Sequence, residues 1–202
     1  MTTIYFVRHG ESTANVGGVT MPHADIPLSD LGRHQAKNLA EQFAVQPSCI
    51  LVSKYLRTQQ TAQPLSEKTQ QAINVHPLLH EFSALGHSLI EGMTGVQRRP
   101  IAHAYWEASD PFMRMGDEAE TFMEFNGRVN AYILDFPNLS DQTVVFGYGI
   151  WFALLFWKLQ GNDCDDPSSM RAFRQYQLSL PMQNCAVYSL KNIGSNRWHV
   201  AS

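Results

Sequence analysis

The sequence predicts an α/β fold: a three-layer α/β/α sandwich on a mostly parallel central sheet with an antiparallel edge. Short β-branched and aromatic runs alternate with stretches of helical periodicity, which is typical of parallel strands covered by helices on both faces. Two more short runs near the end of the chain, separated by a turn-rich segment, predict an edge hairpin. Residues 78–116 contain repeated Gly and Pro without periodicity and predict a small irregular cap insertion.

Length and composition indicate one domain over residues 1–202, with the cap inserted into it. Hydrophobic residues make up 44% of the 202 residues and charged residues only 16%. A chain of this length buries roughly 70% of its unfolded surface, so it needs neither a disulfide nor a metal for stability. The three cysteines lie far apart and form no CxxC motif, which argues against a disulfide framework or a zinc site.

The charge balance restricts the partners. The net charge is −3 and the chain has no Lys/Arg block, which argues against a general nucleic-acid binder. The most apolar stretch, residues 144–157, is too short to span a bilayer, and residues 1–10 do not resemble a signal peptide. We therefore expect a cytoplasmic protein that contacts neither nucleic acid nor membrane.

The chain begins with a strand, a loop and a helix. Residues 3–7 form a β-branched and aromatic run that ends abruptly at polar residues, as a buried strand does. Residues 16–28 contain Gly and Pro and predict a loop, after which Ser29 is the expected N-cap of a helix. The positions that recur at helical spacing, and that we expect to face inward, are Leu31, Gln35, Leu39 and Phe43.

The middle of the chain continues the alternation. Residues 49–52 predict a second strand, and Ser53 is expected to cap the helix that follows. Residues 72–75 predict a third strand, and residues 143–146 a fourth. Between them, residues 117–136 predict a helix with one apolar stripe. The stripe consists of Ala119, Phe122, Phe125, Val129, Tyr132 and Ile133.

The last third predicts an apolar helix and the hairpin. Residues 150–159 form the helix, and their aromatic and leucine side chains indicate either core or a subunit interface. Residues 185–190 and 198–201 are the predicted hairpin strands, joined by a turn at residues 192–196.

Polar residues follow three of the predicted strands where each strand ends. Arg8 and His9 follow the first, Arg57 lies in the helix after the second, and Tyr148 stands between two glycines after the fourth. Ligands of open α/β sheets bind outside the carboxyl ends of the strands, where helix N-termini favour an anion. Arginine binds phosphate oxygens bidentately, and a neutral imidazole can attack phosphorus. The pattern therefore indicates a phosphoryl group.

The ordered motifs resemble the histidine phosphatase superfamily, which has the phosphoglycerate-mutase-like fold. The resemblance covers about residues 3–160 in the order of the family. The matching segments are VRHGESTAN at 7–15, DIPLSDLG with the following Gln35 and Ala36, SKYLRTQQTA at 53–62, LHE at 79–81, residues 116–121 with Arg128 and Val129, and residues 144–149.

The resemblance implies a role for each matching residue. His9 matches the nucleophile that becomes phosphohistidine, and Arg8 and Arg57 match the two arginines that clamp the phosphoryl oxygens. Glu81 matches the carboxyl group that protonates the leaving oxygen and then deprotonates water, for which it needs a raised pKa. The implied phosphate-binding positions are Arg8, Asn15, Arg57, Tyr148 and Gly149. The acidic residues that compete with Glu81 for its role are Glu91, Glu107 and Glu118.

One position departs from the family pattern. Where the family has a second histidine between two glycines, this chain has Tyr148. A phenol with a pKa of about 10 is neutral and brings no positive charge to the phosphoryl group. Loss of a charged donor costs on the order of 1.5–3 kcal/mol, and loss of a transition-state donor costs roughly 10²–10³ in rate. The longer side chain can also place its hydroxyl where a phosphate oxygen belongs.

The favoured function is a phosphatase that hydrolyses a small phosphomonoester through phosphohistidine, with activity reduced by Tyr148. The alternative is a pseudo-phosphatase that binds a phosphorylated ligand or partner without turnover. A phosphoglycerate mutase ranks below both, because similar mutases are generally longer and have a larger insertion around the cap. Residues 82–116 and the loop at 16–24 are expected to select the substrate.

No cofactor and no metal are expected, because no histidine pair has a clear ligand spacing with a carboxylate; the segment after His80 is not HExxH. The oligomeric state is left open, a homodimer included. Arg98 and Arg99 form either a solvated pair or a pair that reaches into the site and binds an anionic substrate tail.

Overall fold

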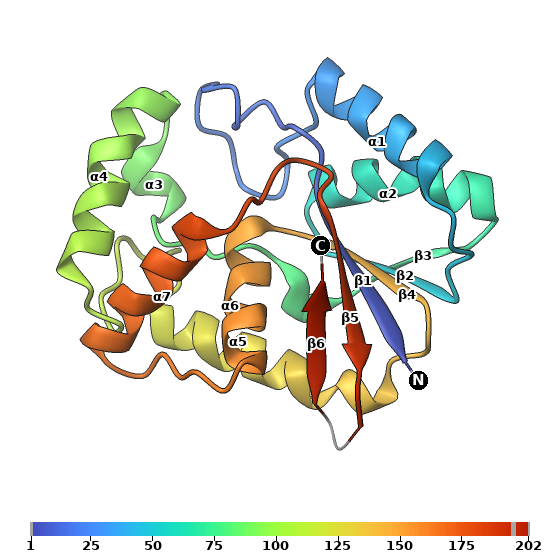
Figure 1. Cartoon of the computed structure of the whole chain (residues 1–202). Helices are drawn as coiled ribbons and strands as arrows, with labels where there is room; N and C mark the ends of the chain where they lie inside the picture. The colour runs from blue at the N-terminus through green and yellow to red at the C-terminus, as the bar shows by residue number, and fades with distance from the viewer. Residues whose placement is uncertain (1, 195–196, 202) are drawn as a thin grey trace.

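A six-stranded sheet forms the centre of the molecule (Figure 1). The computed structural model describes residues 2–194 and 197–201. The strand order is β3-β2-β4-β1-β5-β6. The first four strands are parallel to one another, β5 runs antiparallel to β1, and β6 runs antiparallel to β5. The strands are β1 (Thr3–Arg8), β2 (Cys49–Val52), β3 (Ile73–Val75), β4 (Thr143–Gly147), β5 (Val187–Asn192) and β6 (Trp198–Ala201). The predicted fold class, with its antiparallel edge, is confirmed.

The strands carry side chains to two separate apolar clusters, one on each face of the sheet. In β1, Ile4 and Phe6 belong to one cluster, and Val7 belongs to the other. In β4, Val145 joins the first cluster, whereas Phe146 joins the second. Side chains alternate across a strand, so a strand buried on both faces is apolar throughout, as the sequence of β4 is.

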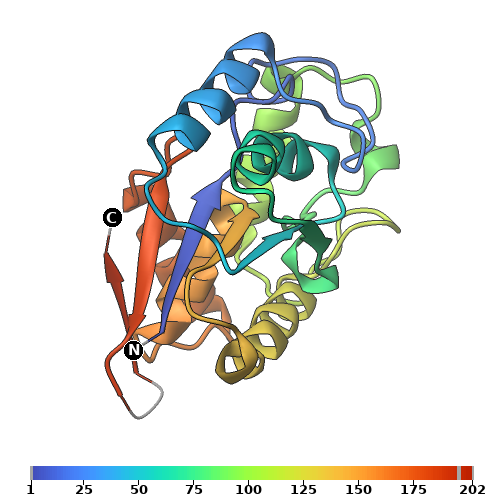
Figure 2. The ribbon, with the colours of Figure 1, turned by 90° about the vertical axis from the view of Figure 1, so that its right-hand side faces the viewer.

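Helices cover both faces of this sheet (Figure 2). Helices α1 (Asp30–Gln42) and α2 (Leu56–Thr69) pack on one face, and α5 (Phe122–Leu134) and α6 (Gly149–Leu159) pack on the other. Helix α6 is the most apolar, and its residues 151–156 are all buried. Of the two interpretations of this helix, core is therefore the one that the fold supports. Among the described residues, no helix is both long enough and apolar enough to cross a membrane.

The cap differs from the predicted irregular segment. It contains a short helix, α3 (His87–Ile90), and a 14-residue helix, α4 (Gly95–Ala108). Thr94 and Gln97 form a capping box that starts α4, and the helix continues through Pro100. A further unpredicted helix, α7 (Pro167–Ser179), packs beside α4 and is capped by Asp166 (Figure 1). In both helices a local start signal was present; in α4 the Gly and Pro content obscured it.

Three other boundaries are corrected by the structure. Helix α5 begins at Phe122 rather than at residue 117, because Thr121 and Glu124 form its capping box. Ser53 does not cap α2, whose N-cap is Tyr55; the Ser53 hydroxyl accepts the Tyr55 N–H at 3.0 Å instead. The edge hairpin is shifted, with β5 ending at Asn192, and positions 195 and 196 of the predicted turn lie outside the described residues.

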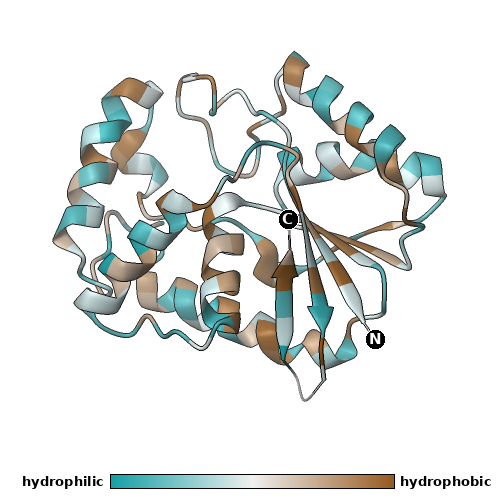
Figure 3. Cartoon of the chain, viewed as in Figure 1, coloured by the Kyte–Doolittle hydropathy of each residue, from teal (hydrophilic) through white to brown (hydrophobic). Residues whose placement is uncertain are grey.

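The inward face of α1 also differs from the expected one. Ser29 caps the helix as predicted, with its hydroxyl accepting the Gly32 N–H at 3.0 Å. The buried residues of the helix are Gly32, Ala36 and Ala40, and Leu31 is 54% exposed. Leu39 and Phe43 pack into the cluster on this face of the sheet, as expected. Figure 3 accordingly shows α1 mainly in the teal of hydrophilic residues, with isolated brown positions.

A close approach of two backbone segments holds the loop after β1. A Cβ built on Gly32 would lie 1.9 Å from the Glu11 carbonyl oxygen, and one on Gly10 would lie 2.7 Å from the Gly32 carbonyl oxygen. Only glycine allows this approach, by which α1 supports the segment directly after β1.

Two matched Gly→Ala substitutions should therefore have opposite effects on stability. Gly32→Ala must push the loop after β1 away from α1, and we expect a loss of about 1–3 kcal/mol or more in the free energy of unfolding. Gly127→Ala, on the exposed side of α5 with no atom within 4 Å of the new Cβ, should stabilise by roughly 0.5–1 kcal/mol. Urea denaturation measures both, and equal effects of the two substitutions would contradict the packing argument.

Candidate active site

A cavity of about 430 Å³ lies at the carboxyl ends of the parallel strands. It contains every residue that the sequence analysis assigned to the site. The lining consists of Arg8, His9, Ser12, Ala14, Asn15, His23, Ile26, Arg57, Glu81, Arg98, Tyr148, Gly149, Ile150, Gln177, Leu178, Leu180 and Met182. A larger hollow of about 700 Å³ between α1 and α2 is lined by none of the predicted site residues.

His9 is held in one orientation and one tautomer. It directly follows β1, is 5% exposed, and its backbone N–H donates to the Gly147 carbonyl at 3.0 Å. Its Nδ1 lies 2.6 Å from the carbonyl oxygen of Gly10. A carbonyl only accepts, so Nδ1 carries the proton and Nε2 keeps its lone pair. Burial, and then the charges of Arg57 and Arg8, lower the pKa of His9 to about 3, so the ring is neutral at pH 7.

Two guanidinium groups lie on the same cavity. Arg57, in the first turn of α2, is 5% exposed and donates to the His23 carbonyl at 2.7 Å. Arg8, the last residue of β1, donates to the Met182 carbonyl, and its Nε has no hydrogen-bond partner among the described residues. Burial lowers the pKa of Arg8, whereas the charge of Glu81 raises it. An anion in the cavity would give the buried Nε the partner that a polar group needs.

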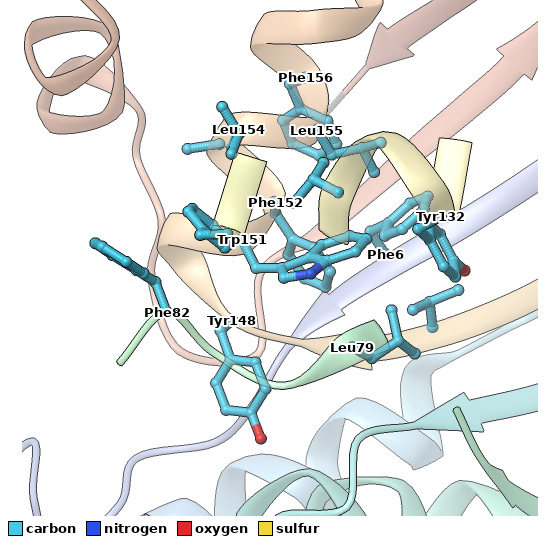
Figure 4. Packing of buried hydrophobic residues seen from close by; sticks show 14 of the residues in the cluster. Phe6, Leu79, Phe82, Tyr132, Tyr148, Trp151, Phe152, Leu154, Leu155 and Phe156 are labelled. Carbon is cyan, nitrogen blue, oxygen red and sulfur yellow. The ribbon is translucent and has the colours of Figure 1, made fainter. Parts of the chain in front are cut away.

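Tyr148 contacts Arg57 with its ring and Ser53 with its hydroxyl. The Arg57 guanidinium carbon is 4.6 Å from the centre of the Tyr148 ring, which is a cation–π contact. The Tyr148 hydroxyl is 2.5 Å from Ser53 Oγ, and both residues are 0% exposed. Figure 4 shows this hydroxyl directed away from the apolar cluster. The Tyr148 hydroxyl therefore has a hydrogen-bond partner inside the protein, and the residue lines the cavity.

Glu81 sits at the N-terminus of α6. Its Oε1 accepts the Phe82 N–H at 2.9 Å and the Trp151 N–H at 3.2 Å, and its Oε2 accepts the Ile150 N–H at 3.3 Å. Burial raises the pKa of this carboxyl group; the Phe82 N–H, the charge of Arg57 and the Ile150 N–H oppose the rise. The raised pKa favours the protonated carboxyl group more than in an exposed glutamic acid, which suits a group that transfers protons.

The acidic residues that compete with Glu81 do not line the cavity. Glu107 pairs with His103 on the exposed side of α4, and Glu118 accepts a hydrogen bond from Ser88. Glu91 is exposed after α3. Gly149, the first residue of α6, lies at the cavity with its Cα facing Arg8; a Cβ built there would be 3.7 Å from Arg8 Nε.

Asn15 belongs to a loop that curls over the site. Its Oδ1 accepts hydrogen bonds at 3.0 Å from the backbone N–H and the hydroxyl of Ser12. The Nδ2 group is therefore the part of the amide that remains to donate into the cavity. Asn184 reaches this loop from the segment before β5 and donates to the His9 carbonyl at 3.0 Å.

Sequence reasoning missed one wall of the cavity. The end of α7 and the segment after it contribute Gln177, Leu178, Leu180 and Met182. No motif marks these residues, so only the packing of α7 beside α4 brings them to the site. His23 was also missed, although it lies in the loop expected to select the substrate. Arg98 lines both the cavity and an adjoining outer hollow, whereas Arg99 lines only the outer hollow.

The charges of the site suit an anion. Three arginines and one carboxyl group line the cavity, and the N-terminal end of α6 adds backbone N–H groups. Within residues 2–194 and 197–201, no three His, Cys, Asp or Glu side chains come together in a way that would hold a metal ion.

The lowered histidine pKa values predict a loss of stability in acid. Burial, with Arg57 and Arg98, lowers the pKa of His23 to about 4, against about 6.5 in an unfolded chain. Between these values the unfolded state binds more protons, so the free energy of unfolding falls as pH decreases from about 6.5. Urea denaturation at pH 7 and pH 5 measures the fall in the free energy of unfolding between the two pH values. This fall should be smaller for His23→Gln than for the parent, by on the order of 1 kcal/mol.

The control for this measurement is Ala104→Gln, an exposed substitution on α4 that adds or removes no titratable group. It should show the pH dependence of the parent. Identical pH dependence of His23→Gln and Ala104→Gln would contradict the assignment of a buried neutral His23.

Comparisons with known proteins identify the family of the chain. The sequence matches the histidine phosphatase superfamily (branch 1) over residues 4–200. It is 27% identical over 162 residues to the adenosylcobalamin/alpha-ribazole phosphatase of Escherichia coli (strain K12), covering 78% of this chain and 79% of that protein. A probable phosphoglycerate mutase GpmB of Yersinia pestis (strain Pestoides F) is 32% identical over 170 residues, or 80% of this chain and 76% of that protein.

Among solved structures, a mycobacterial glucosyl-3-phosphoglycerate phosphatase in complex with VO3 superposes with a TM-score of 0.77. It is 24% identical, and the match covers 100% of this chain and 98% of that one, which shows a shared fold. The family match covers nearly the whole sequence and includes the strand ends that form the cavity. The chain therefore belongs to the histidine phosphatase superfamily.

Proposed function

We propose that the protein is a phosphatase that hydrolyses a small phosphomonoester through a phosphohistidine at His9. The observation that carries the proposal is a neutral imidazole with a free Nε2 lone pair, which shares one cavity with two arginines and a carboxyl group. Family membership supports it, as do relatives that are themselves named as phosphatases.

In the first step, His9 Nε2 attacks phosphorus and the bond from phosphorus to the leaving oxygen breaks. The proton of the Glu81 carboxyl group passes to the leaving oxygen, so the alcohol departs neutral. The nucleophile needs its lone pair, and the lowered pKa of His9 supplies the neutral form without a separate base. Arg8 and Arg57 are placed to bind the phosphoryl oxygens in both steps.

In the second step, the Glu81 carboxylate takes a proton from water as that water attacks phosphorus. The phosphorus–nitrogen bond breaks, and inorganic phosphate and neutral His9 are released. The backbone N–H groups that hold Glu81 stabilise its ionised form, whereas burial stabilises its protonated form, so one residue serves both steps.

Tyr148 stands where the family has a second histidine, and we propose that it reduces the rate. Its hydroxyl is occupied by Ser53, so it gives the phosphoryl group neither a charge nor a hydrogen bond. Burial raises the pKa of Tyr148 to about 12, which keeps the phenol neutral. What the ring supplies is support for Arg57 through the cation–π contact. The site therefore keeps its nucleophile and clamp but lacks one donor.

The presence of Tyr148, which brings no positive charge, also favours one second candidate, a pseudo-phosphatase that binds a phosphorylated ligand or partner without turnover. A mutase activity ranks third. Relatives named as probable phosphoglycerate mutases are similar to this chain, but the cap comprises only about 40 residues and α4 is its one long helix among the described residues.

The remaining proposals concern organisation, location and partners. We propose a single domain over residues 1–202 with a cap at 78–116, action in the cytoplasm without cofactor or metal, and no nucleic-acid or membrane partner.

Substitution of the nucleophile tests the reaction type. His9→Ala should abolish phosphate release from 4-nitrophenyl phosphate and should abolish labelling of the protein by a ³²P-labelled substrate, because no nitrogen remains to accept the phosphoryl group. His103→Ala removes an exposed histidine on α4 and is the matched control, with activity expected to equal that of the parent. Equal rates from His9→Ala and the parent would refute the proposal.

Substitution of Tyr148 separates the phosphatase from the pseudo-phosphatase. Tyr148→His restores a donor, and we expect kcat/KM to rise by about 10–10³. Tyr148→Phe removes the bond to Ser53 but adds no donor, so it should not raise the rate. No rise with Tyr148→His, together with tight phosphate binding measured by calorimetry, would favour the binding function instead.

A further inference from the structure

A second hollow of about 250 Å³ opens from the side of the cavity. His23, Arg98 and Ile150 line both spaces, so the two adjoin. The other residues of this side hollow carry no charge. They are Phe82, Ala84, Leu85, Ile90, Ala102 and Trp106.

The side hollow lies on the side of the cavity where the leaving group must be. Glu81 is the proposed proton donor to the leaving oxygen, and its carboxyl group accepts the N–H groups of Phe82 and Ile150. The side chains of Phe82 and Ile150 in turn line the side hollow. A substrate phosphorylated through an oxygen near Glu81 therefore extends its next atoms toward these apolar residues.

The walls of the side hollow are held by packing. The Phe82 ring stacks on Phe125 of α5 with centroids 4.7 Å apart, and it contacts Trp106 at 6.0 Å. On its other side, Trp106 is covered by the guanidinium group of Arg174, 4.5 Å from the ring. Such a preformed apolar space binds an apolar group with little cost of ordering its walls.

Arg98 lies at the border between the polar cavity and the apolar side hollow. Its Nη1 donates to Thr20 Oγ1 at 2.9 Å, and Thr20 in turn donates to the Met93 carbonyl at 2.7 Å. These bonds tie the loop after β1 to the cap and keep the guanidinium group at the border. Arg99 is exposed and lies on the outer hollow, so the two arginines do not form a joint clamp in the side hollow.

We propose that the side hollow binds the leaving group, and that the substrates are phosphomonoesters of alcohols with a compact apolar or aromatic group close to the ester oxygen. This inference rests on the phosphatase function proposed above. It assigns the phosphoryl group to Arg8, His9 and Arg57 and the apolar group to the space between Phe82, Ile90 and Trp106. Arg98, where the cavity meets the side hollow, can bind a polar atom of the substrate there. Its charge disfavours a long apolar chain in the cavity that holds the phosphoryl group.

The test compares methyl, n-butyl and 2-phenylethyl phosphate. Their alcohols have similar pKa values, so differences in kcat/KM report binding of the leaving group rather than chemistry. Burial of each methylene is expected to raise kcat/KM about fourfold, with 2-phenylethyl phosphate at least about tenfold above methyl phosphate. Equal kcat/KM for the three, or a higher value for 3-phosphoglycerate than for 2-phenylethyl phosphate, would overturn the inference in favour of a polar or anionic leaving group.

Two substitutions on α4 locate the effect. Ala102 lines the side hollow and the edge of the outer hollow, and Ala102→Phe should reduce the preference for 2-phenylethyl over methyl phosphate to within about threefold. Ala104→Phe adds the same side chain at an exposed position of the same helix and should keep the preference of the parent. A preference that Ala102→Phe leaves intact would place the apolar group elsewhere and overturn the inference.

Binding of phosphonates separates this inference from the proposed function. If no phosphate ester, including 4-nitrophenyl phosphate, is hydrolysed, the phosphatase proposal fails. Calorimetry with methylphosphonate and 2-phenylethylphosphonate then still tests the side hollow. At least about tenfold tighter binding of the phenylethyl compound to the parent, lost in Ala102→Phe, supports it, and equal affinities refute it.

Discussion

The parallel pairing of β1 with β4 is the constraint on which the site depends. In this register Arg8 lies opposite Gly147, and the His9 N–H donates to the Gly147 carbonyl. The residues after the two strands, His9 and Tyr148, therefore leave the sheet at the same level, with ring centres 5.3 Å apart. Because side chains alternate along a strand, a slip of one residue would exchange the two faces of β1 and move His9 away from its neighbours.

Burial and charge then act on His9 in the same direction. The ring is removed from water, and Arg57 and Arg8 add positive charge nearby, so the protonated form is disfavoured twice. The two arginines attract an anion at the same time. In the proposed reaction, the cations that bind the phosphoryl group and the neutral nucleophile that attacks it are thus products of one arrangement.

The site has two halves of different chemistry. Arg8, Arg57 and the start of α6 form a cationic half at the strand ends, whereas the cap supplies an apolar half around Phe82 and Trp106. The cationic half comes from the sheet and its adjoining helix ends, and the apolar half from residues 82–106. If the proposed function holds, a change of the cap alters which alcohol is bound without altering how phosphate is bound, because the two halves share only His23, Arg98 and Ile150.

The sequence by itself determined β1, β2 and β4 and the residues of the cationic half. Apolar runs and strand-end motifs are local signals, and parallel strands bring their carboxyl ends to one edge wherever they pair. Helix α4 carried a local signal as well, the capping box at Thr94, but Gly95 and Pro100 obscured it.

Only the tertiary structure decided the direction of the Tyr148 hydroxyl, the wall supplied by the end of α7 and the side hollow. Tyr148 finds its partner Ser53 95 positions away in the chain, and Arg98 finds Thr20 78 positions away. Such partners are selected by packing between segments that the sequence leaves far apart, so no local pattern contains them.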